Sequence, residues 1–303
     1  DMTKVNTTAV IGLGSMGLGM AHALLRAGHR VRGCDLNPVA LADLSAQGGQ
    51  VAATPAEAAQ GADAVVIVVV NAAQTAAVLG GGDGVLAGLQ PGAVLICSPT
   101  MAPRDAEGFA AQVAAVGGLY LDAPISGGAV RAEAGELTVM ASGAPAAFAA
   151  AEPALAAMAG TVYRLGDAVG VGAAFKMVNQ LLAGVHIAAA CEAITLAKSL
   201  GLDIAKVYEV ITQSAGNSWM FENRVPHVLD GDYAPRSAVS IFTKDLGIVS
   251  DLGRQQKFPL PISSAALQLF TMTEAAGMGR DDDASVARFL AQISGLTLPG
   301  MED

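Results

Sequence analysis

The sequence predicts an α/β fold in which a doubly wound parallel sheet is followed by an all-α second half. Between residues 9 and 164, short apolar runs alternate with helix-like stretches, which is typical of a parallel sheet with helices on both faces. From Gly170 the strand-like runs stop and long helical stretches follow. A chain of 303 residues is expected to form about two domains. We therefore expect one domain over residues 1–168 and a second over residues 169–303.

The first predicted strand runs directly into a glycine-rich turn. The apolar run 9–11 precedes Gly12-Leu13-Gly14-Ser15-Met16-Gly17, and a helix-like stretch follows up to Arg26. In this order the first glycine permits a tight turn, the second lets the backbone approach a pyrophosphate, and the third lets the helix pack on the strand. The free N–H groups at the helix N-terminus also attract phosphate. The turn predicts a dinucleotide site in a Rossmann-type domain; a glycine turn with a purely structural role is the alternative.

An acid ends the second predicted strand. Residues 29–34 lead to Asp35, about 20 residues beyond the turn, where such domains bind a ribose 2′-hydroxyl. The carboxylate would repel a 2′-phosphate, and residues 36–38 contain no Arg to hold one. Arg32 precedes the acid in the strand and is a poor substitute. The sequence therefore favours NAD over NADP as the cofactor.

The remaining elements of the first half follow in alternation. The β-branched run 64–70 is typical of a strand buried on both faces, and Thr54-Pro55 has the form of a helix N-cap followed by proline. The glycine-rich stretch 80–84 lacks the Lys-Ser/Thr ending of a phosphate loop, so we expect a surface loop. Further strands are expected at 51–53, 94–97, 119–122, 136–141 and 161–164, and helices near 41–44, 75–79, 103–116 and 145–158.

The second half is predicted to be helical throughout. The apolar run 168–191 is long enough to raise the question of a membrane span, but Lys176 and His186 lie within it. Charged groups near the centre of a span are costly, so we expect a long helix buried in protein. The expected helices are 170–199, 203–214, 217–229, 240–256, 261–276 and 282–292.

The net charge and the cysteine content indicate which partners and which cellular compartment to expect. The formal net charge is −10 and no Lys/Arg cluster is present, so neither nucleic acid nor a membrane surface is an expected partner. Cys34, Cys97 and Cys191 are isolated in apolar runs, which favours buried free thiols over disulfides or a metal site. No signal peptide is visible. We therefore expect a cytoplasmic protein without a bound metal.

Three further stretches carry groups suited to ligand binding. Ser126-Gly127-Gly128, after Pro124, combines a hydroxyl with two unhindered amides, a backbone nest that suits a carboxylate; a tight turn without a ligand is the alternative. Thr100 lies just past a predicted strand, where open α/β sheets bind ligands. Lys244 either contacts the cofactor or the substrate anion, or pairs at the surface with Asp245.

Lys176 is the strongest catalytic candidate. It is the only Lys, Arg, Asp or Glu between residues 168 and 191, and a buried ammonium is costly unless it has a partner or a purpose. Asn179 and Gln180 follow three and four residues later, near the same helix face. Such a lysine can act as general acid/base when hydride leaves a carbon that bears a hydroxyl. The alternative is a lysine that extends from the helix edge into solvent.

Together these motifs resemble the β-hydroxyacid dehydrogenases, the family that contains 3-hydroxyisobutyrate dehydrogenase and tartronate semialdehyde reductase. The resemblance covers nearly the whole chain. It depends on the glycine turn with Met20-Ala21, on Asp122-Ala-Pro-Ile-Ser-Gly-Gly128 with Ala132 and Gly135, on Gly170-Val-Gly172 before Lys176, and on Lys244-Asp245-Leu246.

The resemblance implies a role for each motif. The glycine turn would hold the pyrophosphate, Asp35 the adenosine ribose, and Thr100 would lie beside the nicotinamide. Ser126, Gly127 and Gly128 would bind the substrate carboxylate. Lys176 would be the acid/base, with Asn179 and Gln180 on the substrate and Lys244 near the cofactor or substrate. The family also implies a homodimer or homotetramer.

Two positions depart from the family pattern. The family usually has Asn four residues after the catalytic lysine, where this chain has Gln180, and Ser98-Pro99-Thr100 differs from the usual Ser/Thr-rich run. The stretch 217–226 together with Gln180 looks like the branch that oxidises L-threonate at C2 with NAD. A tartronate semialdehyde reductase or a 3-hydroxyisobutyrate dehydrogenase is the enzymatic alternative, and a dinucleotide-binding scaffold is the alternative without catalysis.

Overall fold

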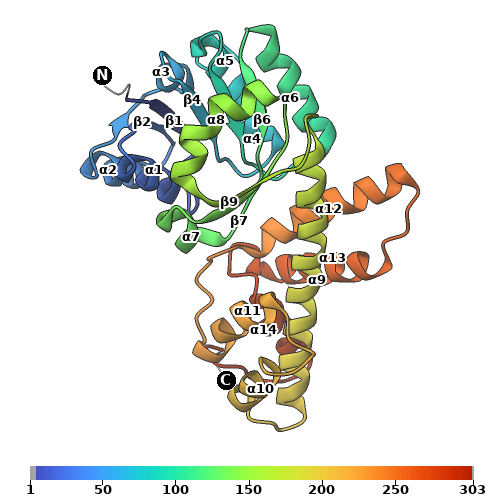
Figure 1. The fold of residues 1–303 in the computed structure, drawn as a ribbon. Helices are drawn as coiled ribbons and strands as arrows, with labels where there is room; N and C mark the ends of the chain where they lie inside the picture. Colours follow the sequence, from blue (N-terminus) through green and yellow to red (C-terminus); the bar gives the residue numbers. More distant parts are fainter. Residues whose placement is uncertain (1–4, 302–303) are drawn as a thin grey trace. The chain divides into compact units, whose positions relative to one another are not determined.

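The computed structural model describes residues 5–301, which form two compact units that divide after Lys176. Helix α9 (Val171–Ser199) runs through the division (Figure 1). The first four residues, on which part of the expectation about a signal peptide depends, lie outside the described residues.

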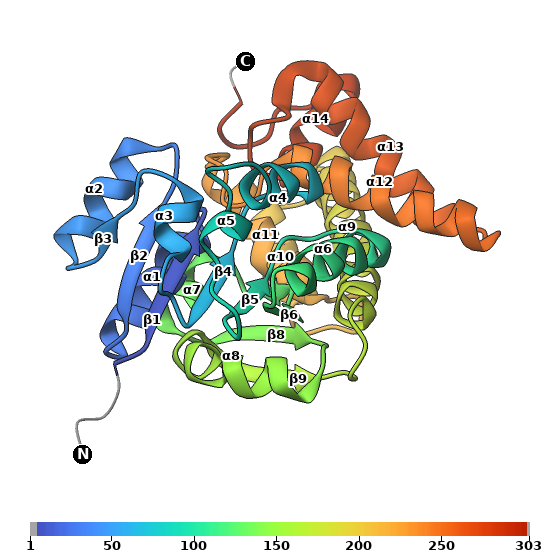
Figure 2. The same cartoon turned by 90° about the horizontal axis from the view of Figure 1, so that it is seen from above.

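A six-stranded parallel sheet forms the centre of the first unit. Its strand order is β3-β2-β1-β4-β5-β6, so the order reverses between β1 and β4, where such sheets bind ligands (Figure 2). The predicted α/β fold is therefore confirmed. The strands are β1 Thr7–Ile11, β2 Arg30–Cys34, β3 Gln50–Val51, β4 Ala64–Ile67, β5 Val94–Cys97 and β6 Leu119–Asp122.

Helices cover both faces of this sheet. The helices are α1 Gly17–Arg26, α2 Pro38–Ala46, α3 Pro55–Ala59, α4 Ala72–Leu79, α5 Val85–Gly88, α6 Pro103–Ala115 and α8 Pro145–Met158. Alternate strand residues enter two separate cores. Val10 and Val66 pack with α1, α2 and α8, whereas Ile11 and Ile67 pack with α3, α5 and α6. The predicted cap is present, since Thr54 Oγ1 accepts a hydrogen bond from Glu57 N at 3.1 Å.

A second, three-stranded sheet differs from the expected arrangement. The strands predicted at 136–141 and 161–164 do not extend the parallel sheet; they form β8 (Leu137–Ala141) and β9 (Ala159–Arg164), with the short strand β7 (Ile125–Ser126) antiparallel to β8. Helix α7 (Gly128–Ala134), which was not among the expected elements, connects β7 to β8. Seven residues that begin with glycine give too weak a periodic signal to be detected.

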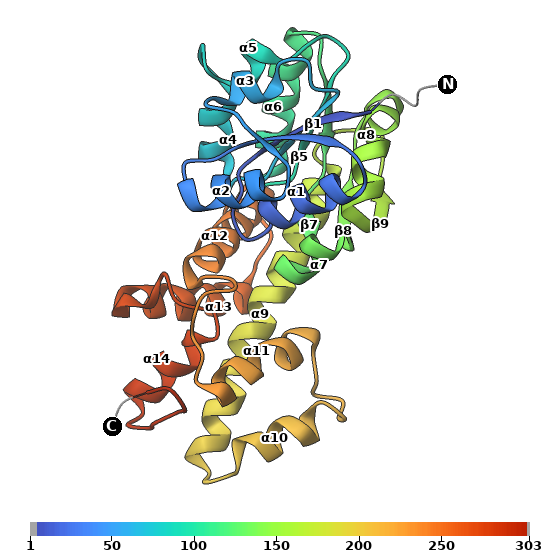
Figure 3. The ribbon, with the colours of Figure 1, turned by 90° about the vertical axis from the view of Figure 1, so that its left-hand side faces the viewer.

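The second unit is helical, as predicted. Helices α10 and α11 accompany the second half of α9 (Figure 3), and one core contains Ile187 and Ile194 of α9, Phe221, Phe242 and Phe270. The elements are α10 Ile204–Ile211, α11 Trp219–Asp230, α12 Val239–Gln256, α13 Pro261–Thr273, the π-turn η1 Glu274–Met278 and α14 Ser285–Ile293.

Helix α9 is long and apolar enough to cross a bilayer by length and composition. However, 56% of its apolar window is buried inside the protein, which is the behaviour of a core helix. All three cysteines are buried free thiols, as predicted.

Asp122 holds the first turn of α9. Its Oδ2 accepts hydrogen bonds from Gly170 N at 3.0 Å and Ala173 N at 2.9 Å, while Ser142 Oγ accepts from Gly172 N at 2.9 Å. These contacts satisfy backbone donors that have no partner within the helix. Burial raises the pKa of Asp122 to about 6, although the N–H groups of Ala173 and Gly170 act in the opposite direction. The start of α9, and with it Lys176 one turn later, is thereby fixed to the end of β6.

The raised pKa of Asp122 predicts a pH-dependent stability. Because the native pKa of about 6 exceeds the unperturbed 3.8, the native state binds more protons between these values, and stability falls as pH rises from about 4 to about 6. We expect the wild type to lose about 2–3 kcal/mol over this window relative to Asp122→Asn, which cannot titrate. Urea unfolding at a series of pH values measures this difference. The exposed Asp167→Asn serves as control, and parallel curves for wild type and Asp122→Asn would contradict the prediction.

Candidate active site

The glycine turn after β1 is shaped by close packing at two positions and left open at a third. Gly12 has φ +94°, and a Cβ there would lie 2.6 Å from Val68 O; a Cβ on Gly17 would lie 1.9 Å from Gly12 O. A Cβ on Gly14, by contrast, would have no neighbouring atom within 4 Å. Packing therefore requires Gly12 and Gly17, whereas the absence of a side chain at Gly14 leaves room for a ligand to approach the backbone.

A cavity of about 450 Å³ opens beside this turn. It is lined by residues of the turn and of α1 and α7: Gly14, Ser15, Leu18, Gly19, Ala129, Val130 and Glu133. The N-terminal N–H groups of the ten-residue helix α1 lie at this turn, and such groups bind phosphate oxygens. The residues present therefore fit the pyrophosphate of a dinucleotide.

Asp35 lies against the same turn. Its Oδ2 accepts from Leu13 N at 2.6 Å and its Oδ1 from Asn37 N at 2.7 Å. Arg32, the nearest basic residue along the chain, donates instead to the carbonyl of Gln60. A carboxylate held at this point, without Arg32 beside it, fits a ribose with a free 2′-hydroxyl.

Lys176 is buried and contacts the second predicted motif. Its side chain is 7% exposed, and Nζ donates a hydrogen bond to Ile125 O at 2.8 Å. Ile125 directly precedes Ser126-Gly127-Gly128, and Gly127 and Gly128 have φ of +135° and +77°, which favours glycine. The structure thus brings the lysine and the proposed carboxylate nest together from positions 51 residues apart. The alternative of a lysine that extends into solvent is wrong.

One series of linked polar side chains in the second unit contains Asn179, Gln180, Asp245 and Lys244. Asn179 Nδ2 donates to Gln180 Oε1 at 2.9 Å, and Gln180 Nε2 donates to Asp245 Oδ2 at 2.7 Å. Lys244 Nζ lies 2.9 Å from Asp245 Oδ1. The pairing of Lys244 with Asp245 was one of the two expectations for this lysine; its contact with a cofactor stays a prediction.

Asp245 is a buried member of this hydrogen-bonded group and was not among the residues expected from the sequence. It is 1% exposed and shares the buried face of α12 with Phe242, Leu246 and Val249. An acid at helical spacing among apolar residues was the available signal. Because a buried carboxylate needs hydrogen bonds or a counter-charge, such a position predicts polar partners elsewhere in the fold.

Other polar residues have structural contacts. His22 bridges Asp43 and Glu133, and His227 contacts Asp282 at 2.8 Å. Thr100 follows β5 at the carboxyl edge of the sheet, the edge at which the glycine turn leaves β1, and its role stays a prediction. Within residues 5–301, no group of three or more His, Cys, Asp or Glu side chains is arranged to hold a metal ion.

Comparison with known proteins places both halves of the chain. Residues 7–166 match the family described as the NAD binding domain of 6-phosphogluconate dehydrogenase, and residues 170–290 match the family described as NAD-binding of NADP-dependent 3-hydroxyisobutyrate dehydrogenase. The chain is 54% identical over 291 residues to an L-threonate dehydrogenase of Cupriavidus necator, covering 96% of this chain and 97% of that protein. It is 33% identical to human mitochondrial 3-hydroxyisobutyrate dehydrogenase, covering 93% and 86%.

A solved structure agrees with these matches. The crystal structure described as 3-hydroxyisobutyrate dehydrogenase from Salmonella typhimurium superimposes with a TM-score of 0.90 at 51% identity, covering 93% of this chain and 99% of that one. The sequence matches span nearly the full length and the folds agree. The chain therefore belongs to the 3-hydroxyisobutyrate dehydrogenase family, the β-hydroxyacid dehydrogenases to which its motifs pointed.

Proposed function

We propose that the protein is an NAD-dependent dehydrogenase of a small hydroxy acid, with L-threonate, oxidised at C2, as the favoured substrate. The observation that carries this proposal is the buried Lys176 side-chain nitrogen, 2.8 Å from the carbonyl that precedes the Ser126–Gly128 turn. The same unit contains the glycine turn and Asp35, which fit the cofactor. A proton-accepting amine, a carboxylate site and a hydride acceptor are the three requirements of hydroxy-acid oxidation.

The cofactor end is held by the first unit. The turn from Gly12 to Gly17 would hold the pyrophosphate through N–H groups other than those of Gly12 and Leu13, which donate to Cys34 O and Asp35 Oδ2. Asp35 would accept a hydrogen bond from the adenosine ribose, and Thr100 would contact the nicotinamide. Bound NAD supplies the electrophilic ring carbon that accepts hydride from the substrate. Lys244 is assigned to the cofactor or substrate region through its position next to Asp245.

The substrate end depends on Lys176 and the nest. Ser126 Oγ and the N–H groups of Gly127 and Gly128 donate to the substrate carboxylate, which places C2 beside the amine. As hydride leaves C2, the C2 hydroxyl proton moves to Nζ of Lys176, and a ketone remains. The carbonyl of Ile125 accepts a hydrogen bond from the resulting ammonium and holds its orientation. In the reverse direction Lys176 returns this proton.

Two observations support L-threonate over smaller acids as the substrate: the similarity to L-threonate dehydrogenases and the carboxamide of Gln180. The L-threonate dehydrogenases of C. necator and of Escherichia coli K12 are 54% and 49% identical to this chain. Gln180 and Asn179 offer two carboxamides to the hydroxyls of a four-carbon chain. Tartronate semialdehyde and 3-hydroxyisobutyrate, the alternatives, present fewer hydroxyls. We further propose a cytoplasmic location, with neither nucleic acid nor membrane as partner, in keeping with the net charge of −10.

A substrate panel tests the proposed function. We expect NADH absorbance to rise fastest with L-threonate, at least tenfold faster in kcat/KM than with 3-hydroxyisobutyrate or glycerate, because a site built for hydroxyls rejects analogues that lack them. NADP in place of NAD should lower kcat/KM with every acid. Equal or faster turnover of 3-hydroxyisobutyrate would refute the substrate, and tight NAD binding without turnover of any acid would favour the scaffold alternative.

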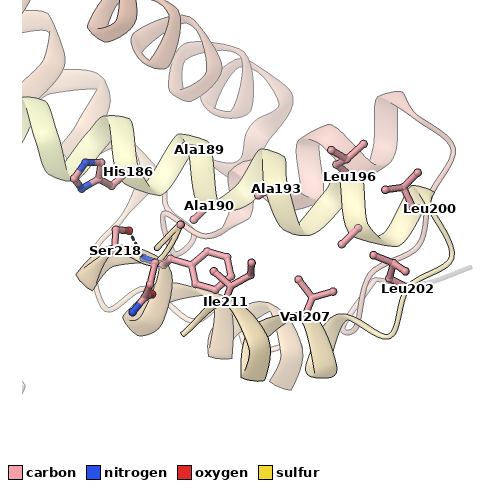
Figure 4. Close-up of a pocket in the computed structure, with 14 residues that line it drawn as sticks. His186, Ala189, Ala190, Ala193, Leu196, Leu200, Leu202, Val207, Ile211 and Ser218 are labelled. Carbon is pink, nitrogen blue, oxygen red and sulfur yellow. Dashed lines mark hydrogen bonds between the residues drawn. The ribbon is translucent and has the colours of Figure 1, made fainter. Parts of the chain in front are cut away.

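We also propose that the protein forms a homodimer or homotetramer through α9. Val178, Leu182, Leu196 and Leu200 are between 49% and 66% exposed and follow one another at helical spacing. An apolar groove of about 550 Å³ lies alongside, between α9 and helices α10 and α11 (Figure 4). A helix that leaves such a stripe exposed is typical of an interface, and a second copy offers a matching stripe.

A charge in the stripe tests this assembly. We expect Leu196→Glu to reduce the mass measured by light scattering to that of one 30.3 kDa chain, because a carboxylate would be buried without a partner. Lys198→Glu, two residues away on the same helix, should leave the mass unchanged. A wild type that is itself monomeric would refute the proposal.

A further inference from the structure

The hydrogen-bonded side chains of Asn179, Gln180 and Asp245 have a fixed donor-to-acceptor direction, which the Asp245 carboxylate sets. Asp245 is buried, and its Oδ2 receives an N–H from Gln180 at 2.7 Å. A carboxylate is an acceptor only, so the amide of Gln180 must turn its nitrogen to Asp245. The Gln180 oxygen then points the other way, where Asn179 Nδ2 donates to it at 2.9 Å. One carboxylate therefore fixes the orientation of two carboxamides.

The same logic defines what the two amides offer to a ligand. These two hydrogen bonds occupy one N–H of each carboxamide, and Gln180 Oε1 is the acceptor in one of them. The remaining functions are the second N–H of Gln180, the second N–H of Asn179 and the Oδ1 of Asn179, which are two donors and one acceptor. A hydroxyl group is itself both donor and acceptor, so a fixed set of this kind is complementary to an alcohol.

The length of Gln180 is what makes the connection to α12. Asp245 lies 65 residues away in sequence, and the Nε2–Oδ2 distance is already at the short end of hydrogen bonds. Asparagine at position 180 would be one methylene shorter and would leave Asp245 Oδ2 without this donor. Lys244, 2.9 Å from Oδ1, supplies a counter-charge to the buried carboxylate.

We propose that Asp245 is a positioning residue that fixes the Gln180 and Asn179 carboxamides and thereby sets the preference for a hydroxy acid with a further hydroxyl beyond the oxidised carbon. The inference rests on the function proposed above and deepens it. Asp245 acts through Gln180 and not on the reacting atoms. Its loss changes which substrates bind well, and leaves hydride transfer itself largely intact.

The test compares L-threonate with 2,4-dihydroxybutanoate and 2,3-dihydroxybutanoate, which lack the C3 and the C4 hydroxyl respectively. In Asp245→Asn either end of the new amide can face Gln180, so the orientation is no longer fixed. We expect the ratio of kcat/KM for L-threonate to kcat/KM for at least one deoxy acid to fall about tenfold, which corresponds to the loss of one hydrogen bond. The change should appear as a higher KM for L-threonate. We expect kcat to change less than about threefold. Asp251→Asn, an exposed acid on the same helix, is the matched control.

A double-mutant cycle separates positioning from general structure. Gln180→Met removes both amide contacts, and Asp245→Asn added to it should cause no further loss of preference, because the two residues act as one unit. If Asp245→Asn does not fold, Gln180→Asn breaks the same bond with the carboxylate retained and should lose the same preference. The inference is overturned if a folded Asp245→Asn variant keeps the wild-type preference for L-threonate, or if the two substitutions cause additive losses of that preference. In either case, wild-type turnover of L-threonate would still support the proposed function. A wild type that oxidises no hydroxy acid would overturn both.

Discussion

Burial of a lysine amine is the constraint on which the rest of the structure depends. An ammonium removed from water is costly unless an acceptor compensates it, and for Lys176 that acceptor includes the carbonyl of Ile125. The contact ties α9 to β7, and β7 leads directly into the turn at Gly127. At the helix start, Asp122 and Ser142 satisfy the free N–H groups and fix where the first turn begins. The position of the amine is therefore determined by two independent sets of hydrogen bonds.

Much of the candidate cofactor site could be selected from the sequence because its determinants are local. Gly12, Gly14 and Gly17 act within a single turn, and Asp35 follows at the end of the adjacent strand, where it contacts Leu13. The parallel sheet with helices on both faces follows from the alternation of strand-like and helix-like stretches. Local pattern could not show that β7, β8 and β9 form a sheet of their own, because pairing between strands is decided by contacts distant in sequence.

Single residues of the candidate substrate site could be selected from the sequence, but the contacts between them could not. Lys176 and the Ser126–Gly128 turn were each selected from the sequence, but their contact joins residues 51 apart. Asp245 was missed because its hydrogen bond joins it to Gln180, 65 residues away, and not to its neighbours in sequence. The departure from the family at position 180 thus acquires a physical meaning only in the structure, where the longer side chain reaches a buried carboxylate.

The role of Lys176 is the central claim, and the pH-dependence of turnover in Lys176→Met measures it most directly. Methionine keeps the apolar stem of the side chain and removes the amine. The account predicts that kcat with L-threonate falls about 10²- to 10⁴-fold at every pH between 6 and 10, with NAD affinity unchanged, because proton transfer loses its acceptor. Lys198→Met, on the same helix, should retain wild-type turnover. Near-normal kcat in Lys176→Met would contradict the account.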